Sequence, residues 1–335
     1  RTIKTTHLNQ AHTIAAKMTF HPDSLPSLSG KVYIVTGGTA GIGYYTVARL
    51  AQRGAHVYLC ARSEAKGQKA IEGIQSLYPN SNLSVLVMDH MSLPTVVAAA
   101  KLFMTKETVL HGLVNNAGIM ATPFELTEHG YEAHWQINYI AHWLFTSHLL
   151  PLLLETSKTL PAGSVRIVNL TSGGHMSAPK PGIDFEDTSL AKAAPITQYG
   201  QSKLANILHA KTLNKRYGPG SSSAKNGKGE IWTSSVHPGI VESELDDRAL
   251  EMPWFMTIAS GIAQAIGARW PTDKGAWTPV FCATSPEMKP EQSGEYFERI
   301  AKTGGMLQSA KSKDMELAEK LERWVEAEMK KQGYI

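Results

Sequence analysis

The sequence predicts an α/β fold: a doubly wound, mostly parallel sheet of seven strands with helices on both faces, in a single domain. Two observations predict it. From Lys31 onward, short apolar runs rich in β-branched residues alternate with longer stretches of helical periodicity. The first apolar run leads directly into a glycine-rich turn, "TGGTAGIG" at 36–43, and then into a helical pattern. Both features are typical of βαβ units, whose strands are buried on both faces.

Each element is placed by its local pattern. The strands are expected at 31–36, 56–61, 83–88, 112–115, 165–171 and 232–237, with a weaker seventh around Tyr296. The helices are expected after Gly43, after Ser63, after Ser92, and over 131–155, 199–217 and 314–331. The segment "GPGSSSAKNGKG" at 218–229 has small and basic residues without an apolar pattern, which predicts a mobile surface loop. The alternation of strands and helices continues after it, so it is not a domain linker.

Residues 31–335 are assigned to the folded domain and residues 1–30 to an N-terminal extension. Because "MTFHPDSLPSLSG" after Lys17 reads like the start of a natural protein, residues 1–17 are either an added segment or a genuine N-terminal arm. No run of about 18 apolar residues occurs, and the first residues lack the apolar centre of a signal peptide. We therefore expect no transmembrane segment and a cytoplasmic protein.

Composition narrows the class of partner. Hydrophobic residues make up 42% of the chain and charged residues 19%, as in ordinary globular enzymes. The net charge is +4 with Lys and Arg dispersed, so no basic patch for nucleic acid is expected. Cys60 and Cys282 each lie in an apolar stretch, which favours buried thiols in a reducing compartment over a disulfide.

The glycine-rich turn is the first candidate ligand site. It lies at the N-terminus of a helix, where free N–H groups and the helix dipole favour a pyrophosphate. Its glycines are spaced three-then-one, unlike the GxGxxG fingerprint, so the prediction also rests on the strand–turn–helix context. The predicted contacts in this turn are Gly37, Thr39, Ala40, Gly41, Ile42 and Gly43.

Arg62 suggests which dinucleotide binds. In dinucleotide-binding folds an acidic residue about 20 positions after the turn binds the ribose hydroxyls, whereas an Arg accommodates the 2′-phosphate of NADP. Here "LCARS" places Arg62 at that distance, and neither Asp nor Glu occurs over 58–63. NADP(H) is therefore the predicted cofactor; the alternative is that Arg62 is simply a solvated residue at the end of a strand.

Polar residues also follow two further strands. Asp89 ends the third strand and "NNAG", with Asn115, Asn116, Ala117 and Gly118, ends the fourth. Open α/β sheets bind ligands at this carboxyl edge, so these residues are added to the cofactor site. Taken singly, each Asn could equally be a turn residue that satisfies local backbone groups.

A Tyr and a Lys carry the predicted chemistry. "YGQSK" places Tyr199 and Lys203 four residues apart, on one face of a helix. Lowering a phenol pKa from about 10 toward 7 requires roughly 4 kcal/mol, which a nearby ammonium and the charge of a nicotinamide can supply. Ser172 ends the fifth strand, where its hydroxyl can bond a substrate oxygen. Thr171 competes for this role, and because strand residues alternate faces only one of the two should point into the site.

The motifs "TGGTAGIG", "NNAG", "INY", "VNLTS", "YGQSK" and "HPGIVES" together resemble the short-chain dehydrogenase/reductase family over residues 31–242. The resemblance implies a Rossmann-type fold and selects Ser172 over Thr171. It implies a catalytic tetrad of Asn138, Ser172, Tyr199 and Lys203, in which Asn138 holds a water for proton relay and Lys203 also bonds the nicotinamide ribose. It places Pro238, Gly239 and Val241 beside the carboxamide, with Ser243 where the family often has Thr.

Within that family, "CARSEAKG", "SKLANIL" and "VHPGIVESEL" look most like the retinol-dehydrogenase-like branch, whose members generally use NADP(H). Many retinol dehydrogenases carry an N-terminal membrane anchor, and no such run occurs here, which argues against a retinoid substrate. Residues 244–271 are rich in Met, Trp and Ile and are the expected cover over a lipophilic substrate. The alternatives for this segment are core packing, a homodimer interface or a membrane-binding helix.

The predicted function is reduction of a carbonyl compound by NADPH, or the reverse oxidation, with Tyr199 as acid/base. The rivals are a sugar epimerase or dehydratase of the extended branch, which usually spaces its glycines two-then-two, and a catalytically silent NADP(H)-binding regulator. His134, His142 and His148 share one helical pattern, but helix histidines are more often packing residues, so no metal site is expected.

Overall fold

In the computed structural model, residues 20–241, 270–298, 300–305 and 308–335 are described. Their strands form one sheet in the order β3-β2-β1-β4-β5-β6-β7-β8. The pairs from β3 through β7 are parallel, and β8 pairs with β7 in the antiparallel sense. The bounds are β1 (Val32–Val35), β2 (His56–Ala61), β3 (Asn82–Val87), β4 (Gly112–Asn115), β5 (Arg166–Leu170), β6 (Trp232–His237), β7 (Tyr296–Glu298) and β8 (Lys302–Thr303).

The predicted doubly wound, mostly parallel sheet is confirmed, with one difference in strand number. The described residues hold an eighth strand, β8, at the edge of the sheet. It consists of two exposed residues that pair with Phe297 and Glu298. A two-residue exposed strand carries no alternation of apolar and polar residues, so the sequence pattern could not reveal it.

Two of the main helices begin at a side-chain cap. The main helices are α1 (Gly41–Gln52), α2 (Glu64–Leu77), α3 (Leu93–Lys106), α4 (Ala141–Lys158), α5 (Pro195–Tyr217), α10 (Trp277–Thr284) and α11 (Met315–Lys331). Ser63 caps α2 by accepting the Lys66 N–H, and Asp314 caps α11 by accepting that of Leu317. The helix α5 begins at Pro195 and not at Tyr199, because proline is well suited to a first helical turn.

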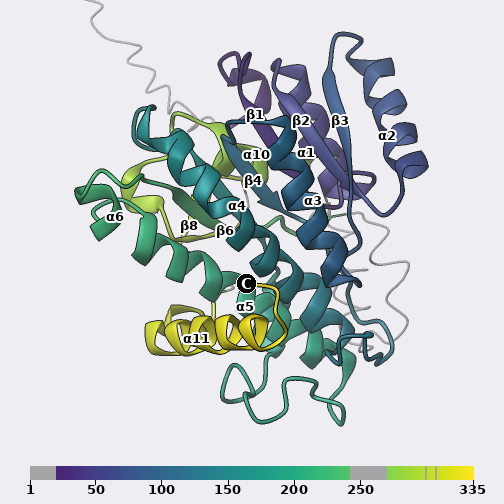
Figure 1. Cartoon of the computed structure of the whole chain (residues 1–335), viewed down its shortest axis with the longest axis vertical. Helices are drawn as coiled ribbons and strands as arrows, with labels where there is room; N and C mark the ends of the chain where they lie inside the picture. Colours follow the sequence, from purple (N-terminus) through teal and green to yellow (C-terminus); the bar gives the residue numbers. More distant parts are fainter. Residues whose placement is uncertain (1–19, 242–269, 299, 306–307) are drawn as a thin grey trace, which may run out of the picture.

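Two hydrophobic cores lie on opposite faces of the sheet. Ile34 and Leu113 belong to the core that contains buried residues of α3, α4, α5 and α11. Tyr33 and Val35, which alternate with Ile34 along β1, belong to the core that contains residues of α1, α2 and α10. Figure 1 shows α11, in yellow, lying along α5, and these two helices are in contact.

Two segments differ from the sequence expectation. The segment 218–229, expected as a mobile loop, contains the short helix α6 (Ser222–Lys225), which Ser221 caps through the Ala224 N–H. A single helical turn needs only a cap and no apolar stripe, so the pattern missed it. The segment 20–30, expected as part of an extension, packs on the core: Phe20 and Leu28 are buried, and the Phe20 ring meets Phe281 at 5.1 Å. Among the described helices, none combines the length and apolarity that crossing a membrane requires.

The order of the strands fixes where a ligand can bind. Strand β1 lies between β2 and β4. The sheet therefore grows from β1 toward β2 and β3 on one side, and from β4 toward β5 and β6 on the other side. At such a switch point the connections leave the carboxyl ends of β1 and β4 toward opposite faces, and a crevice opens between them. The glycine-rich turn follows β1 and "NNAG" follows β4, which places both at this crevice.

Candidate functional site

The glycine-rich turn has the shape that a phosphate needs. Gly37 and Gly41 have φ of +63° and +57°, a region that favours glycine. A Cβ on Gly43 would lie 2.3 Å from the Gly37 carbonyl oxygen and 2.4 Å from Asn116 Nδ2, so no larger residue fits there. Ala40 caps α1 without a side-chain hydrogen bond, which leaves the first N–H groups of the helix for a ligand. The turn therefore fits a pyrophosphate, and Thr39 and Ile42 lie within it.

Thr36 ties the turn to the end of β4. Its Oγ1 accepts the backbone N–H groups of Asn116 at 2.8 Å and Ala117 at 3.0 Å. The Asn116 amide in return donates to the Thr36 carbonyl at 2.9 Å. Thr36 was not among the predicted site residues; the signal was a polar residue at the end of a buried strand, whose hydroxyl must find partners.

Asn115 and Asp89, two other predicted residues of this edge, have contacts away from the glycine-rich turn. Asn115 is 2% exposed, and its amide donates to Thr146 and Asn169, so it links β4 to α4 and β5 inside the protein instead of facing the turn. Asp89 is half-buried, and its carboxylate accepts the Met91 N–H at 3.0 Å in a local turn. Asp89 thus satisfies a local backbone group, whereas Asn115 bonds side chains far along the chain and does not act as a turn residue.

Arg62 is exposed at the carboxyl end of β2, one residue beyond Ala61. Within the described ranges it has no ion pair or hydrogen bond of its own. The neighbouring Gly38 N–H bonds the Cys60 carbonyl at 3.3 Å, so the glycine turn and the end of β2 are adjacent. A guanidinium in this position is available to a phosphate bound beside the turn.

The segment after β6 lies against the same turn. Gly239 has φ of +94°, and a Cβ there would lie 3.4 Å from the Trp270 ring. Val241 pairs with Trp270, and a Cβ on Gly275 would contact both Val241 at 2.8 Å and Ile42 at 3.3 Å. The loop of Pro238 and Gly239 is thereby held near the start of α1. Ser243 and residues 244–269 of the expected substrate cover lie outside the described residues.

Ser172, and not Thr171, is free to meet a substrate. The Thr171 hydroxyl donates to the Lys203 carbonyl at 2.7 Å, which turns it toward α5. Ser172 Oγ accepts the Gly174 N–H at 3.0 Å, and among the described residues its own hydrogen has no acceptor. An oxygen already used as an acceptor is pre-set to donate its proton to a substrate oxygen.

Tyr199 lies beside Ser172, and Lys203 lies beside Tyr199. A Cβ on Gly174 would be 2.7 Å from the Tyr199 ring and 3.4 Å from Ser172 Oγ, so only a glycine fits between the two side chains. The Lys203 ammonium lies 5.7 Å from the centre of the Tyr199 ring and donates to the Leu170 carbonyl at 3.2 Å. Burial lowers the pKa of Lys203 to about 8, which still leaves most of it protonated at pH 7.

Asn138 lies in the π-helical segment η2 (Trp135–Ile140) that precedes α4. Its Oδ1 accepts the Ile119 N–H at 2.9 Å, and its Nδ2 donates to the Ile119 carbonyl and to Ser202 Oγ. A Cβ on Gly118 would lie 3.0 Å from Asn138 Oδ1 and 3.2 Å from Lys203 Nζ. The structure therefore brings Asn138 and Lys203 together around Gly118, and Tyr199 and Ser172 together around Gly174.

The three histidines of the helical pattern contact three separate sets of partners. His134 Nδ1 pairs with Glu132 at 2.6 Å, and His148 Nε2 meets the Tyr334 carbonyl at 3.0 Å. His142 contacts Thr36, Asn138 and His90. No cluster of metal-ligating side chains occurs in the portion of the chain that is described.

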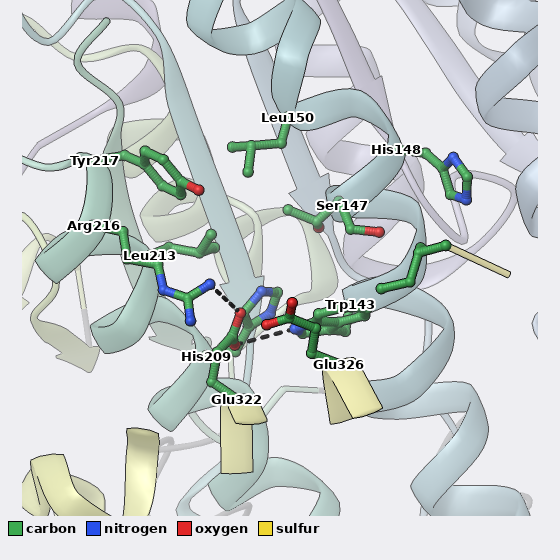
Figure 2. Close-up of a pocket in the computed structure, with 12 residues that line it drawn as sticks. Trp143, Ser147, His148, Leu150, His209, Leu213, Arg216, Tyr217, Glu322 and Glu326 are labelled. Carbon is green, nitrogen blue, oxygen red and sulfur yellow. Dashed lines mark hydrogen bonds and ion pairs between the residues drawn. The ribbon is translucent and has the colours of Figure 1, made fainter. Parts of the chain in front are cut away.

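A hollow lies between α4, α5 and α11, and His148 is one of the residues that line it. It measures about 380 Å³, and none of its described lining residues belongs to the predicted tetrad. In Figure 2 the Glu322 carboxylate points toward Arg216 and Trp143, which donate to it at 3.0 and 3.1 Å. Thr212 donates to the same group at 3.3 Å, so Glu322 fastens α11 to α4 and α5.

Known proteins share both sequence and fold with this chain. Residues 31–183 match the family model described as short chain dehydrogenase. A short-chain dehydrogenase/reductase of Aspergillus calidoustus, drtF, is 50% identical over 94% of this chain and 98% of its own length. Mouse retinol dehydrogenase 12 is 34% identical over 88% of this chain and 84% of its own length.

Among solved structures, an uncharacterised protein from Mycobacterium paratuberculosis superposes with a TM-score of 0.69 at 24% identity, over 92% of this chain and 97% of its own. This likeness bears on the fold alone. The fold, the glycine turn and the two relatives lead to one conclusion: the chain belongs to the short-chain dehydrogenase/reductase family, in its retinol-dehydrogenase-like branch.

Proposed function

We propose that this protein is an NADP(H)-dependent oxidoreductase that interconverts a carbonyl and an alcohol on a lipophilic small molecule, with Tyr199 as acid/base. One observation carries the proposal. The Ser172 hydroxyl and the Tyr199 ring flank Gly174, and the Lys203 ammonium lies 5.7 Å from the Tyr199 ring centre. Ser172 follows the carboxyl end of β5, and Lys203 on α5 reaches the same end through the Leu170 carbonyl.

A bound nicotinamide would supply or accept the hydride at the substrate carbon. The residues of the chain bind the substrate oxygen and transfer its proton. Ser172 donates its O–H to the substrate oxygen, and Tyr199 gives up its phenolic proton in reduction and recovers it in oxidation. The Lys203 cation stabilises the negative charge that this transfer leaves on the Tyr199 oxygen.

Asn138 is assigned to the relay that returns the proton from solvent. Its side chain is committed to Ile119 and Ser202. The relay water would therefore bind at its backbone carbonyl, whose oxygen also accepts His142 Nδ1–H at 2.9 Å.

The cofactor choice rests on Arg62. It is exposed at the end of β2 near the glycine turn, and no carboxylate occurs over 58–63. A guanidinium pairs strongly with a phosphate, whereas a ribose hydroxyl gains little from it. The lipophilic substrate class is supported by mouse retinol dehydrogenase 12, which is named for an apolar alcohol.

The catalytic assignment is tested by Tyr199→Phe. The wild type should oxidise NADPH in the presence of at least one compound from a panel of ketones, aldehydes and quinones. The variant should lose at least a hundred-fold in kcat, the usual contribution of a general acid, while NADPH affinity stays within two-fold. The control is Tyr33→Phe, a buried tyrosine of β1. Retained turnover in Tyr199→Phe would remove this residue from its role, and no turnover by the wild type would favour a silent binding protein.

The cofactor assignment is tested by Arg62→Ala. Titration should show about a ten-fold or greater loss in NADPH affinity and little change for NADH, because only NADPH carries the 2′-phosphate. Lys66→Ala, an exposed cation in α2, is the matched control. Equal losses for the two nucleotides would contradict the assignment.

A further inference from the structure

His142 lies in the first turn of α4, and its side chain is 1% exposed. Its ring contacts three separate elements of the molecule. These are Thr36 at the end of β1, Asn138 in η2, and His90 in the segment that follows β3. No other residue described above touches both the residue that opens the glycine turn and a member of the predicted tetrad.

The hydrogen bonds determine which ring nitrogen carries the proton. His142 Nδ1 lies 2.9 Å from the Asn138 carbonyl oxygen, which can only accept, so Nδ1 must be the donor. In a neutral ring, Nε2 is then an acceptor. It lies 2.8 Å from Thr36 Oγ1 and 3.2 Å from His90 Nε2.

The Thr36 hydroxyl has one matching arrangement. Its oxygen accepts two backbone N–H groups, from Asn116 and Ala117, which uses both of its lone pairs. Its hydrogen is therefore directed to the remaining close acceptor, His142 Nε2; the Val114 carbonyl is farther away at 3.5 Å. A continuous chain of hydrogen bonds thus runs from the "NNAG" backbone through Thr36 and His142 to Asn138.

The surroundings keep the His142 ring neutral. Burial and the adjacent His90 lower the pKa of His142 well below its ordinary value, and the bond to Asn138 opposes them. The nearby Lys203 and His209 also lower the pKa of His142. A second ring proton on Nε2 would also point at a Thr36 oxygen that has no free lone pair.

We propose that His142 is a positioning residue, whose imidazole accepts from Thr36 and donates to Asn138 and so sets the cofactor turn and the catalytic segment in one fixed arrangement. The role in turnover rests on the proposed function; the role in nucleotide binding does not. NADPH affinity should depend on the contact between His142 and Thr36, because Thr36 binds the backbone of Asn116 and Ala117. The rate of the chemical step, kcat, should depend on the contact between His142 and Asn138.

Two conservative variants separate the two sides of the ring. His142→Asn keeps a donor near the Nδ1 position but cannot reach Thr36. His142→Gln places its carbonyl near the Nε2 position, where it can accept from Thr36, but loses the donor to Asn138. Loss of one buried hydrogen bond gives about a ten-fold effect. His142→Asn should therefore weaken NADPH binding about ten-fold, and His142→Gln should lower kcat about ten-fold with near-normal NADPH affinity.

The measurements are NADPH affinity by fluorescence titration, kcat with a carbonyl substrate found for the wild type, and the thermal midpoint of each variant. A purely structural role would lower the midpoint of both variants alike, with affinity and kcat unchanged well below it, and that result overturns the proposal. If the wild type has no turnover, the proposed function fails, while the affinity loss in His142→Asn still supports or refutes the Thr36 half.

Two further readouts hold even if the variants fold poorly. Thr36→Val removes the hydroxyl at nearly constant volume, and it should lose NADPH affinity by about the same ten-fold. Nitrogen NMR of labelled histidine in the intact protein should show one ring in the neutral Nδ1–H form from pH 7.5 down to 5.5 that changes in Thr36→Val. Unchanged affinity in Thr36→Val, or only Nε2–H and charged rings in the spectrum, would refute the arrangement.

Discussion

Acidification should destabilise this fold through two buried histidines, His209 on α5 and His90 after β3. Their side chains are 3% and 7% exposed. Burial, with a smaller contribution from the charge of Arg216, lowers the pKa of His209 to about 3. Burial lowers the pKa of His90 to about 4, against an opposing effect of Asp89. In the unfolded chain both should titrate near the ordinary value of about 6.5.

The sign of the effect follows from proton binding. Below about pH 6.5 the unfolded chain binds protons that the folded form refuses, so the free energy of unfolding falls as the pH falls. The stabilisation is complete above the unfolded pKa and is lost progressively below it. At pH 5.0, about 1.5 units below that value, each histidine costs about 2 kcal/mol relative to pH 7.5. The pair therefore removes about 4 kcal/mol from a total of typically 5–15 kcal/mol.

Urea unfolding at pH 7.5 and pH 5.0 measures this loss directly. His209→Gln removes one titrating ring, so the difference between the two pH values should shrink by about 2 kcal/mol, whatever the variant costs at pH 7.5. His21→Gln, at a side chain that is 43% exposed, is the control for the same substitution at an accessible site. If His209→Gln shows the same pH difference as the wild type, His209 does not carry the assigned proton linkage.

Two other substitutions follow from contacts in the site and in the helical layer. Gly43→Ala should weaken NADPH binding at least ten-fold, because its Cβ would lie 2.3 Å from the Gly37 carbonyl oxygen and displace the turn. The control is Gly220→Ala, where a Cβ meets nothing within 4 Å and NADPH affinity should not change. Equal titration curves for the two variants would contradict this prediction. Glu322→Ala should lower the free energy of unfolding in urea by about 3 kcal/mol, because Trp143, Thr212 and Arg216 lose their shared acceptor. The control Glu319→Ala, at an exposed side chain, should leave the urea midpoint nearly unchanged. Similar midpoints for the two variants would show that Glu322 does not fasten α11.

Much of the sheet was predictable because its signals are local. The strands 56–61, 112–115 and 232–237 have the same bounds in the structure as in the sequence expectation. Buried parallel strands must be apolar along their whole length, so each one is visible in its own residues. Tyr199 and Lys203 were likewise predictable as neighbours, since a four-residue spacing fixes their relation within a single helix.

The roles that sequence patterns could not predict depend on hydrogen-bond partners far away along the chain. Thr36 meets Asn116 and His142, which are separated from it by 80 and 106 positions. The inward position of Asn115 depends on Asn169, 54 positions away. A short pattern records neither contact, because hydrogen-bond partners of this kind meet only when the sheet has formed.

The sequence by itself determined the parallel sheet, the glycine-rich turn after its first strand and the common helix of Tyr199 and Lys203, since periodicity and fixed spacing act over a few residues. Only the tertiary structure decided that Ser172 and not Thr171 keeps a hydroxyl free to donate, that Asn115 faces the interior, and that His142 joins the two halves of the site. The physical reason is that hydrogen bonds are directional and short, so the role of a polar side chain depends on which distant groups the folded sheet brings within about 3 Å of it.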